Sequence, residues 1–206
     1  MGVGGGNRAE SAVDASVEEI ALPSELNTDQ KFVYDTEVYK DVNTRRLVTN
    51  YAAAHLRLCL HFFEKGEYDK AVREIERARL ISPDYQGFRD LAIVVYGYAG
   101  NVAKAESIAS DFIARDPRNI NYYVQLFNVY RRANRIEDAE KILTNLIEVL
   151  PNNPDGYSLL ASFYRGRGES EKAAGVVRRW LKRHPNDRTA LKLLEELEAE
   201  AKSQKR

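Results

Sequence analysis

The chain has 206 residues, of which 44% are hydrophobic and 30% are charged, and its 31 basic residues balance its 31 acidic residues. A chain without net charge has no global electrostatic preference for nucleic acid or for anionic membrane surfaces. Its single cysteine excludes an internal disulfide, and its most apolar run, residues 91–100, is about half the length needed to cross a bilayer.

The N-terminal residues 1–23 predict a disordered tail. They open on the glycine-rich stretch M-G-V-G-G-G-N and contain few side chains large enough to build a core. The glycines are not a dinucleotide-binding fingerprint, because Asn7 stands where the third glycine is needed and no strand precedes them. We therefore expect no nucleotide cofactor. A signal peptide is not expected either, because no basic region is followed by a hydrophobic core, so the chain is predicted to be soluble and, by default, cytoplasmic.

Residues 24–51 predict a segment that packs on the helices that follow it. Asn43 or Thr44 is placed to cap a long first helix that reaches Lys65. One alternative is that residues 24–41 fold into the binding surface of the helices and close it. Four side chains of the segment are too apolar for a free tail, namely Phe32, Tyr34, Val38 and Tyr39.

Four sets of residues recur every 34 residues and predict four copies of one repeat. Because proline cannot continue a helix, the first set marks where each repeat ends. The second set, glycine or asparagine, tolerates left-handed backbone angles and fits a tight turn between two helices. The alanines leave room for close helix packing, and the aromatic side chains fill the space between helices. The sets are Pro83, Pro117, Pro151 and Pro185; Gly66, Gly100, Asn134 and Gly168; Ala71, Ala105, Ala139 and Ala173; and Phe62, Tyr96, Tyr130 and Tyr164.

Each repeat is predicted to be a helix, a tight turn, a second helix and a short loop. Asn119, Asn153 and Asp187 follow their prolines as N-caps, and Pro154 takes the first helical position. The predicted fold class is therefore an all-α, antiparallel helix-pair solenoid. Its repeats span residues 52–85, 86–119, 120–153 and 154–187, and residues 188–206 form a capping helix with a charged outer face and a short tail.

The chain resembles the tetratricopeptide-repeat family over residues 52–203. The family pattern is W-x2-L-G-x2-Y, then A-x3-F, then P. The second unit departs most from it, with Arg89 in the leading position and Ala109 where a large residue is usual; Phe112, three residues on, is placed to restore that volume. The resemblance implies a right-handed superhelix that binds a protein or peptide on its concave face. The fourth unit fits best, with Tyr157, Leu160, Ala161 and Tyr164, then Ala173 and Val177, then Pro185.

A second resemblance concerns residues 34–51, Y-D-T-E-V-Y-K-D-V-N-T-R-R-L-V-T-N-Y. This stretch is similar to the link before the helical-repeat tail of bacterial multi-pass membrane proteins related to lipid-dependent glycosyltransferases. The resemblance implies an alternative function, in which the chain is the soluble accessory or docking tail of such a membrane protein. The chain would then lie outside the cytoplasm.

The sequence contains no grouping of residues expected of an active site or a metal site. His55 and His61 are six residues apart, which places them on different faces of a helix, and no second cysteine can join them. Cys59 falls in a small-residue position that faces a neighbouring helix, where a buried, inert thiol is expected. No nucleophile, base and orienting group occur together. We therefore expect a non-enzymatic chain without a metal or cofactor.

A basic stretch, R-R-W-L-K-R-H at residues 178–184, has two interpretations. Four cations beside Trp180 would suit nucleic acid or lipid headgroups. In the simpler interpretation, Trp180 packs inward and the cations lie near a helix C-terminus, where the helix dipole favours them. We favour the second interpretation, and expect neither a nucleic-acid partner nor direct membrane insertion.

The first helices of the repeats are expected to line a concave binding surface. Because guanidinium groups fork onto carboxylates, the expected ligand is an extended peptide with an apolar anchor and acidic residues. The alternative is that the arginines are ordinary solvated residues. By resemblance, the chaperone-binding members of the family carry lysine and asparagine where Leu56 and Leu60 stand here, so their carboxylate clamp is absent. Leu56 is also expected on the surface, together with seven residues that we name as candidate binding residues: Leu60, Phe63, Tyr98, Asn128, Arg131, Arg132 and Arg165.

Overall fold

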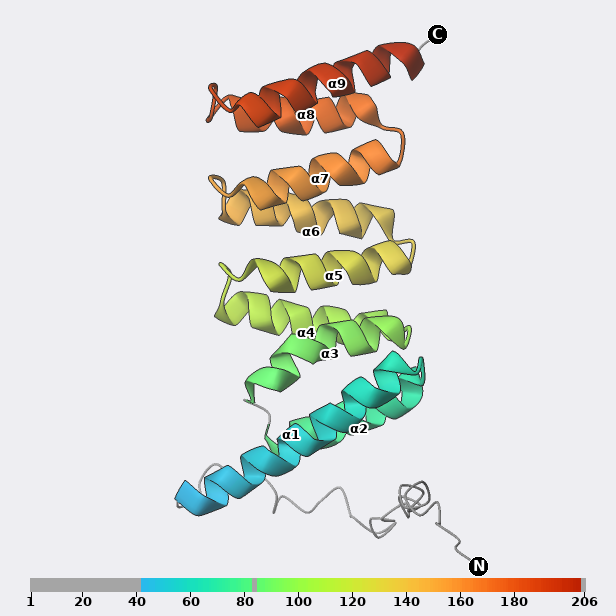
Figure 1. The fold of residues 1–206 in the computed structure, drawn as a ribbon, viewed down its shortest axis with the longest axis vertical. Coiled ribbons are helices and arrows are strands. Elements are labelled where there is room, and N and C mark those ends of the chain that lie inside the picture. The colour runs from blue at the N-terminus through green and yellow to red at the C-terminus, as the bar shows by residue number, and fades with distance from the viewer. Residues whose placement is uncertain (1–41, 83–84, 205–206) are drawn as a thin grey trace, which may run out of the picture. The chain divides into compact units, whose positions relative to one another are not determined.

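The computed structural model describes residues 42–82 and 85–204, and every regular element in those ranges is an α-helix. The helices stack in chain order, each antiparallel to the next (Figure 1). Each packs against its successor, and α3 also contacts α1 and α5. The predicted all-α helix-pair solenoid is confirmed in this part of the chain. The helices are α1 (Val42–Glu64), α2 (Tyr68–Ile81), α3 (Gln86–Tyr98), α4 (Val102–Arg115), α5 (Ile120–Arg132), α6 (Ile136–Val149), α7 (Pro154–Gly166), α8 (Ser170–Leu181) and α9 (Arg188–Gln204).

The turns inside the repeats use left-handed backbone, as predicted. The φ angle is 75° at Gly66, 78° at Gly100 and 75° at Gly168, and 56° at Asn134. In each turn the next amide donates to a carbonyl near the end of the first helix; the amide of Asn101, for example, lies 2.9 Å from the carbonyl oxygen of Tyr96. This is the hydrogen bond of a Schellman motif. It closes the end of one helix and returns the chain antiparallel within a few residues.

The loops between repeats start the next helix with a side-chain cap, also as predicted. Asn119 and Asn153 each accept a hydrogen bond from the amide two residues on, at 3.2 and 2.8 Å. Asp187 accepts two, from the amides two and three residues on, both at 3.0 Å. Pro154 lies in the first turn of α7, where its missing N–H would have had no partner within the helix.

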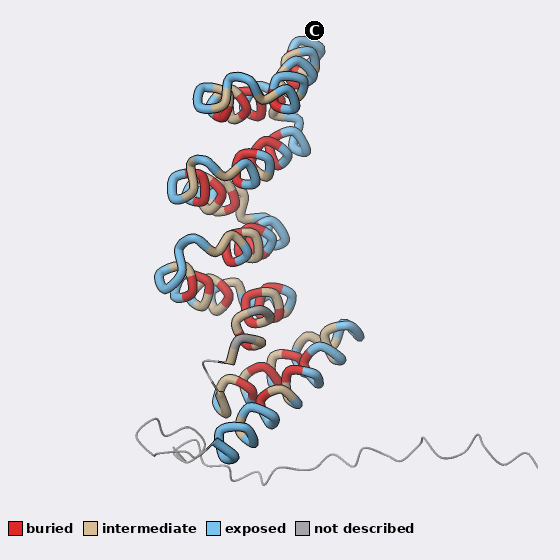
Figure 2. Tube along the Cα trace, turned by 60° about the vertical axis from the view of Figure 1, so that its left-hand side comes forward, coloured by how far each residue is buried: buried red, intermediate tan, exposed pale blue. Residues whose placement is uncertain are grey.

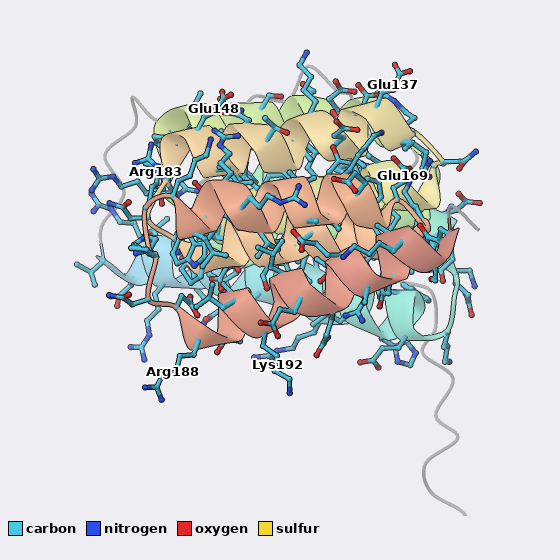
Figure 3. The ribbon with its side chains drawn as sticks, turned by 90° about the horizontal axis from the view of Figure 1, so that it is seen from above. Glu137, Glu148, Glu169, Arg183, Arg188 and Lys192 are labelled. Carbon is cyan, nitrogen blue, oxygen red and sulfur yellow. The ribbon has the colours of Figure 1, made fainter. Side chains whose placement is uncertain are left out.

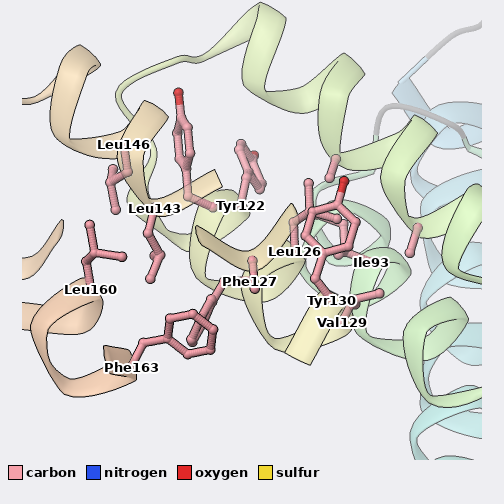
Figure 4. Packing of buried hydrophobic residues seen from close by; sticks show 14 of the residues in the cluster. Ile93, Tyr122, Leu126, Phe127, Val129, Tyr130, Leu143, Leu146, Leu160 and Phe163 are labelled. Atoms are coloured by element: carbon pink, nitrogen blue, oxygen red, sulfur yellow. The ribbon is translucent and has the colours of Figure 1, made fainter. Parts of the chain in front are cut away.

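One apolar cluster extends through the described helices from Leu56 in α1 to Leu197 in α9. Figure 2 shows its buried residues on the sides of the helices that face their neighbours. Figure 4 shows the middle of the cluster, where Phe127 of α5 meets Phe163 of α7. As predicted, the four recurring alanines are fully buried. Three of the four recurring aromatic residues are buried as well, and Phe62 is partly buried.

A polar contact at each repeat junction anchors the recurring tyrosine. Tyr96 of α3 donates its hydroxyl to Glu76 Oε1 of α2 at 2.5 Å. Burial, together with a hydrogen bond to a glutamate of the preceding second helix, raises the pKa of Tyr96, Tyr130 and Tyr164. The buried hydroxyls therefore have the partners that burial demands. A cation near the start of the following helix lies 4.8 to 5.8 Å from the centroid of each recurring ring, and these cations are Lys70, Lys104, Arg135 and Lys172.

The first helix is long, as predicted, but its predicted cap is wrong. Helix α1 contains 23 residues against 13 in α3 and begins at Val42, so it already includes Asn43 and Thr44. The predictions of a disordered tail at residues 1–23 and of a packed segment at 24–41 fall outside the described residues.

The last helix has a buried side and a charged side. Helix α9 packs on α8 and buries Ala190, Leu197 and Ala201. Arg188 and Lys192 extend away from the ribbon of α9 (Figure 3). A terminal helix with a polar outer surface satisfies the need of a solenoid to end without an exposed apolar face.

Candidate peptide-binding face

The groups that could support chemistry are buried or structural. The described residues contain no cluster of three metal-ligating side chains. Cys59 is fully buried; burial, with the charge of Glu74 as a smaller cause, raises the pKa of its thiol to about 12. The reactive thiolate is therefore scarce at neutral pH. In the same part of the chain no helix is both long and apolar enough for a bilayer span.

A buried ionic group in the first repeat was not predicted. Glu74 of α2 exposes 6% of its surface; its Oε2 lies 2.7 Å from His55 Nδ1, and its Oε1 accepts from Arg77 at 2.7 Å. Both carboxylate oxygens thus have partners, which is what makes the burial of such a group tolerable. The other repeats have isoleucine or valine at this position, so a glutamate in an apolar column was the available signal. The group joins α1 to α2.

The basic stretch at residues 178–184 follows the simpler interpretation. Trp180 exposes 9% of its surface, donates its Nε1 proton to Asp187 Oδ2 at 2.8 Å and stacks on His184 with ring centroids 3.8 Å apart. Arg178 binds Glu198 at 2.8 Å and a second carboxylate, on α8, at 3.3 Å. The tryptophan is part of the core, and one of the four cations is neutralised by α9.

The candidate binding residues begin with an aromatic cluster, which we define as Phe63, Tyr68 and Tyr98. The ring centroids of Phe63 and Tyr98 lie 4.8 Å apart, and Tyr68 lies 5.5 Å from each. Leu60, on the same helix as Phe63, leaves 40% of its surface exposed, and Tyr98 leaves 37%. Helices α1 and α3 therefore present accessible apolar surface where the sequence predicted it.

Two arginines of α5 lie beside the aromatic cluster. The Cζ atom of Arg132 is 3.9 Å from the ring centroid of Tyr98, and that of Arg131 is 5.9 Å from the ring centroid of Phe127. Both side chains are exposed, as is Asn128 about one turn earlier. No carboxylate among the described residues pairs with either arginine. A guanidinium that stacks on a ring uses its flat face, so its N–H groups stay available at the edge.

We call the exposed surface of Leu60, the aromatic cluster, Asn128, Arg131 and Arg132 the first-helix face. It brings together six of the seven candidate residues and adds Tyr68. Tyr68 was missed because the family resemblance places binding residues on first helices, whereas Tyr68 begins a second helix. The signal was an aromatic residue two positions after the turn glycine, where later repeats have valine, isoleucine or serine.

The remaining candidate, Arg165, is engaged elsewhere. Its Nη2 lies 2.5 Å from Glu200 Oε1 and 3.6 Å from Glu196 Oε2, both on α9. The hydrogen bond to Glu200 raises the pKa of Arg165, and its charge is already balanced. The expectation that Leu56 lies on the binding surface is wrong: it exposes only 5% and packs so closely on α3 that a methyl group at Gly87 would come within 2.8 Å of it.

Comparisons with known proteins agree with the architecture. Two family models, each described as tetratricopeptide repeat, match residues 98–163 and 157–189. A search of curated proteins found no significant match.

Solved structures were also compared. A tetratricopeptide repeat protein from Parabacteroides merdae is 13% identical, with a TM-score of 0.50 over 73% of this chain and 61% of that chain; at this identity the likeness concerns the fold alone. A thermophilic TPR protein of Thermus thermophilus is 23% identical, with a TM-score of 0.46 over 71% of this chain and 80% of that one. The first TPR of Spaghetti, bound to an HSP90 peptide, is 19% identical, with a TM-score of 0.45 over 57% and 94%. With the repeating turns, caps and alanines described above, the matches to the family models establish that residues 98–189 of this chain belong to the tetratricopeptide-repeat family.

Proposed function

We propose that the chain is a non-enzymatic scaffold whose first-helix face binds an extended peptide with an apolar or aromatic anchor followed by acidic residues. The contact between Arg132 and Tyr98 carries the proposal, because it joins an exposed aromatic cluster to two cations that have no carboxylate partner among the described residues. Neither half alone would distinguish a binding site from ordinary surface.

The anchor of the peptide would rest on the aromatic cluster and Leu60. Phe63 and Tyr98 meet edge to face, which fixes the rings before a ligand arrives and lowers the entropy lost on binding. A buried aromatic or branched side chain contributes roughly 1.5–3 kcal/mol. Aromatic side chains with an exposed edge are also the usual energetic centres of peptide and protein interfaces.

The acidic part of the peptide would reach α5. Neighbouring packed helices lie about 8–10 Å apart, and an extended chain advances about 3.3 Å per residue. An acidic residue roughly three positions from the anchor can therefore meet Arg131 or Arg132. The edges of both guanidinium groups are free to fork onto a carboxylate. Because Arg165 is neutralised by Glu200, the basic part of the face is expected to end at α5.

The test is binding of fluorescein-labelled synthetic peptides, measured by fluorescence anisotropy. The peptides carry tryptophan, phenylalanine or leucine followed by two glutamates at spacings of one to five residues. The double variant Arg131→Glu, Arg132→Glu should bind at least tenfold more weakly, because each charged hydrogen bond contributes about 1.5–3 kcal/mol. The matched control is Lys182→Glu, Arg183→Glu, an adjacent pair of exposed cations at the end of α8, with the same change in net charge and no expected effect.

Two results would count against the proposal. If the α5 double variant is folded, by its circular dichroism, and binds as tightly as wild type, the arginines are not part of the site. If no anchor-and-acid peptide binds the wild-type chain more tightly than its glutamine counterpart, the first-helix face does not recognise this class of ligand.

The alternative function, a docking tail of a membrane-embedded glycosyltransferase-like protein, stays a prediction. It rests on residues 34–51, of which only 42–51 are among the described residues. The test is whether the natural reading frame continues upstream of Met1 into hydrophobic spans; a frame that begins at Met1 would contradict it.

A further inference from the structure

A second site lies at the other end of α3 from the aromatic cluster. A cavity of about 470 Å³ opens between α2, α3 and α4. Arg89, which lines it, is near the start of α3, whereas Tyr98 of the first-helix face is the last residue of that helix. The cavity is therefore separate from the proposed peptide site. Its volume falls in the range of about 300–1,000 Å³ that is typical of small-molecule sites.

The cavity exists because the second repeat departs from the pattern of the others. In the third and fourth repeats, Tyr123 and Tyr157 occupy the position of Arg89, and each donates its hydroxyl to the carbonyl of the proline that ends the preceding repeat, at 3.0 and 3.1 Å. In the second helix, Ala109 replaces the leucine or valine of the later repeats. Two large fillers are thus absent at one level of the stack, and an arginine replaces one of them.

The lining of the cavity has an apolar floor and a cationic rim. Phe88 and Phe112 expose 5% and 6% of their surfaces, and their rings meet edge to face with centroids 6.3 Å apart. Ile108 adjoins them. Phe112 does replace core volume, as the sequence predicted, but it leaves the level of Arg89 open. A ligand in this cavity would therefore place an apolar group on two aromatic rings.

The charges on the rim are unbalanced in favour of cations. Four cationic side chains line the cavity, against one carboxylate, Asp111, which pairs with Arg115 at 3.1 Å. Glu76, behind the rim, lies 2.7 Å from Arg79 Nε and 3.6 Å from Lys104 Nζ. Counting Glu76, the four cations meet two carboxylates in these printed contacts. The cations are Arg79, Arg89, Lys104 and Arg115.

We propose that this cavity binds a small amphipathic anion: an aromatic or branched apolar group that carries a carboxylate or a phosphate. The rings of the floor receive the apolar group, and guanidinium groups of the rim fork onto the anionic oxygens. Each half of the ligand matches one half of the lining, and a neutral apolar molecule of the same shape would leave the excess positive charge of the rim unanswered.

The experiment is isothermal titration calorimetry on the full chain with three probes. 3-Phenylpropionate and phenyl phosphate represent the two anionic groups, and 3-phenylpropionamide is the neutral counterpart of the first. For ligands of this size we expect a Kd on the order of 1 mM for at least one anion, and binding of the amide weaker by tenfold or more.

Two variants and a matched control locate the binding. Ser107→Glu places a carboxylate on the rim, and should weaken anion binding by tenfold or more. Ser110→Glu makes the same change on the same helix at an exposed residue that does not line the cavity, and should leave binding unchanged. Arg89→Tyr restores the residue of the third and fourth repeats, and should abolish binding while the helical circular dichroism is retained.

The proposal is overturned if neither anion gives saturable binding, or if the amide binds as tightly as 3-phenylpropionate. It is also overturned if Ser107→Glu and Ser110→Glu bind the anion equally well. Ser107→Glu decides the matter even if Arg89→Tyr fails to fold, because glutamate at an exposed helical position favours the helix slightly more than serine does.

Discussion

The turn residue Gly100 allows a quantitative test of the repeat geometry. Its φ is 78°, and a methyl group on its Cα would meet no atom within 4 Å. Replacement by alanine therefore creates no clash, and its whole cost is that of holding a residue with a Cβ in left-handed backbone. That cost is about 1–2 kcal/mol. Gly100→Ala should destabilise the protein by this amount.

Gly175 provides the matched control. It lies within helix α8, and a methyl group on its Cα would also meet no atom within 4 Å. Its backbone is helical, so Gly175→Ala removes the entropic cost of glycine in a helix and should stabilise the protein by roughly 0.5–1 kcal/mol. The same chemical change is thus expected to have opposite signs at two positions, and only the backbone angle distinguishes them.

The assay is urea unfolding followed by circular dichroism at 222 nm. With a slope of about 2 kcal/mol per molar urea, Gly100→Ala should lower the midpoint by roughly 0.5–1 M, and Gly175→Ala should raise it by a few tenths of a molar. Asn134→Gly, at the one described turn that uses asparagine, should lower the midpoint by no more than a tenth of a molar or so. A midpoint for Gly100→Ala at or above that of wild type would show that the turn does not require left-handed backbone.

Three further outcomes are expected. Gly97→Ala should destabilise by about 1–3 kcal/mol, because the new methyl group would come within 2.3 Å of Val129; in a Val129→Ala background it should be tolerated, and equal urea midpoints for Gly97→Ala and wild type would argue against so close an approach of α3 and α5. Hydrogen bonds from Trp180 and from the first amides of α9 lower the pKa of Asp187, so its stabilising contribution is present at neutral pH and is lost as the pH falls through that lowered pKa. Asp187→Ala should therefore lower the urea midpoint at pH 7 more than at pH 3, and an equal shift at both would contradict the assignment. Cys59 should resist iodoacetamide at pH 8 in the native state and react after unfolding in urea, because burial raises its pKa to about 12; rapid native labelling, read by mass spectrometry, would refute its burial.

The fold could be predicted because each recurring residue answers a local demand of the backbone. Proline ends a helix wherever it occurs, glycine is needed at positive φ, and asparagine or aspartate caps the helix that follows. These demands involve residues only a few positions apart, so the sequence carries them directly. The exception was the start of α1, where Asn43 and Thr44 looked like caps and the helix simply runs through them. A polar residue at the edge of an apolar pattern marks a helix end only when the preceding residues cannot continue the helix.

The binding face was predicted in part, because its state depends on contacts distant in sequence. Arg165 matches the family position as well as Arg132 does, yet Glu200, 35 residues away, neutralises the first, whereas the second rests on Tyr98. Leu56 also matches, but the absence of a side chain at Gly87 lets it sink into the core. A column of a repeat shows which way a side chain leaves its helix; it does not show what waits there.

A repeat protein makes departures from its own pattern informative, because every other copy serves as an internal control. Arg89 is such a departure: the tyrosines at its position in the later repeats fill the stack and bind a backbone carbonyl, and both contributions are given up here. The second repeat is consequently a junction with less packing than its neighbours, which should open more readily in hydrogen exchange. If an amphipathic anion occupies the cavity, it restores part of that packing and stabilises the folded chain by RT ln(1 + [L]/Kd), about 1.4 kcal/mol at ten times the Kd. The same anion should then slow exchange in α3 and α4 and leave α7 and α8 unchanged, so that the loss of packing and its repair by a ligand are seen at one level of the stack.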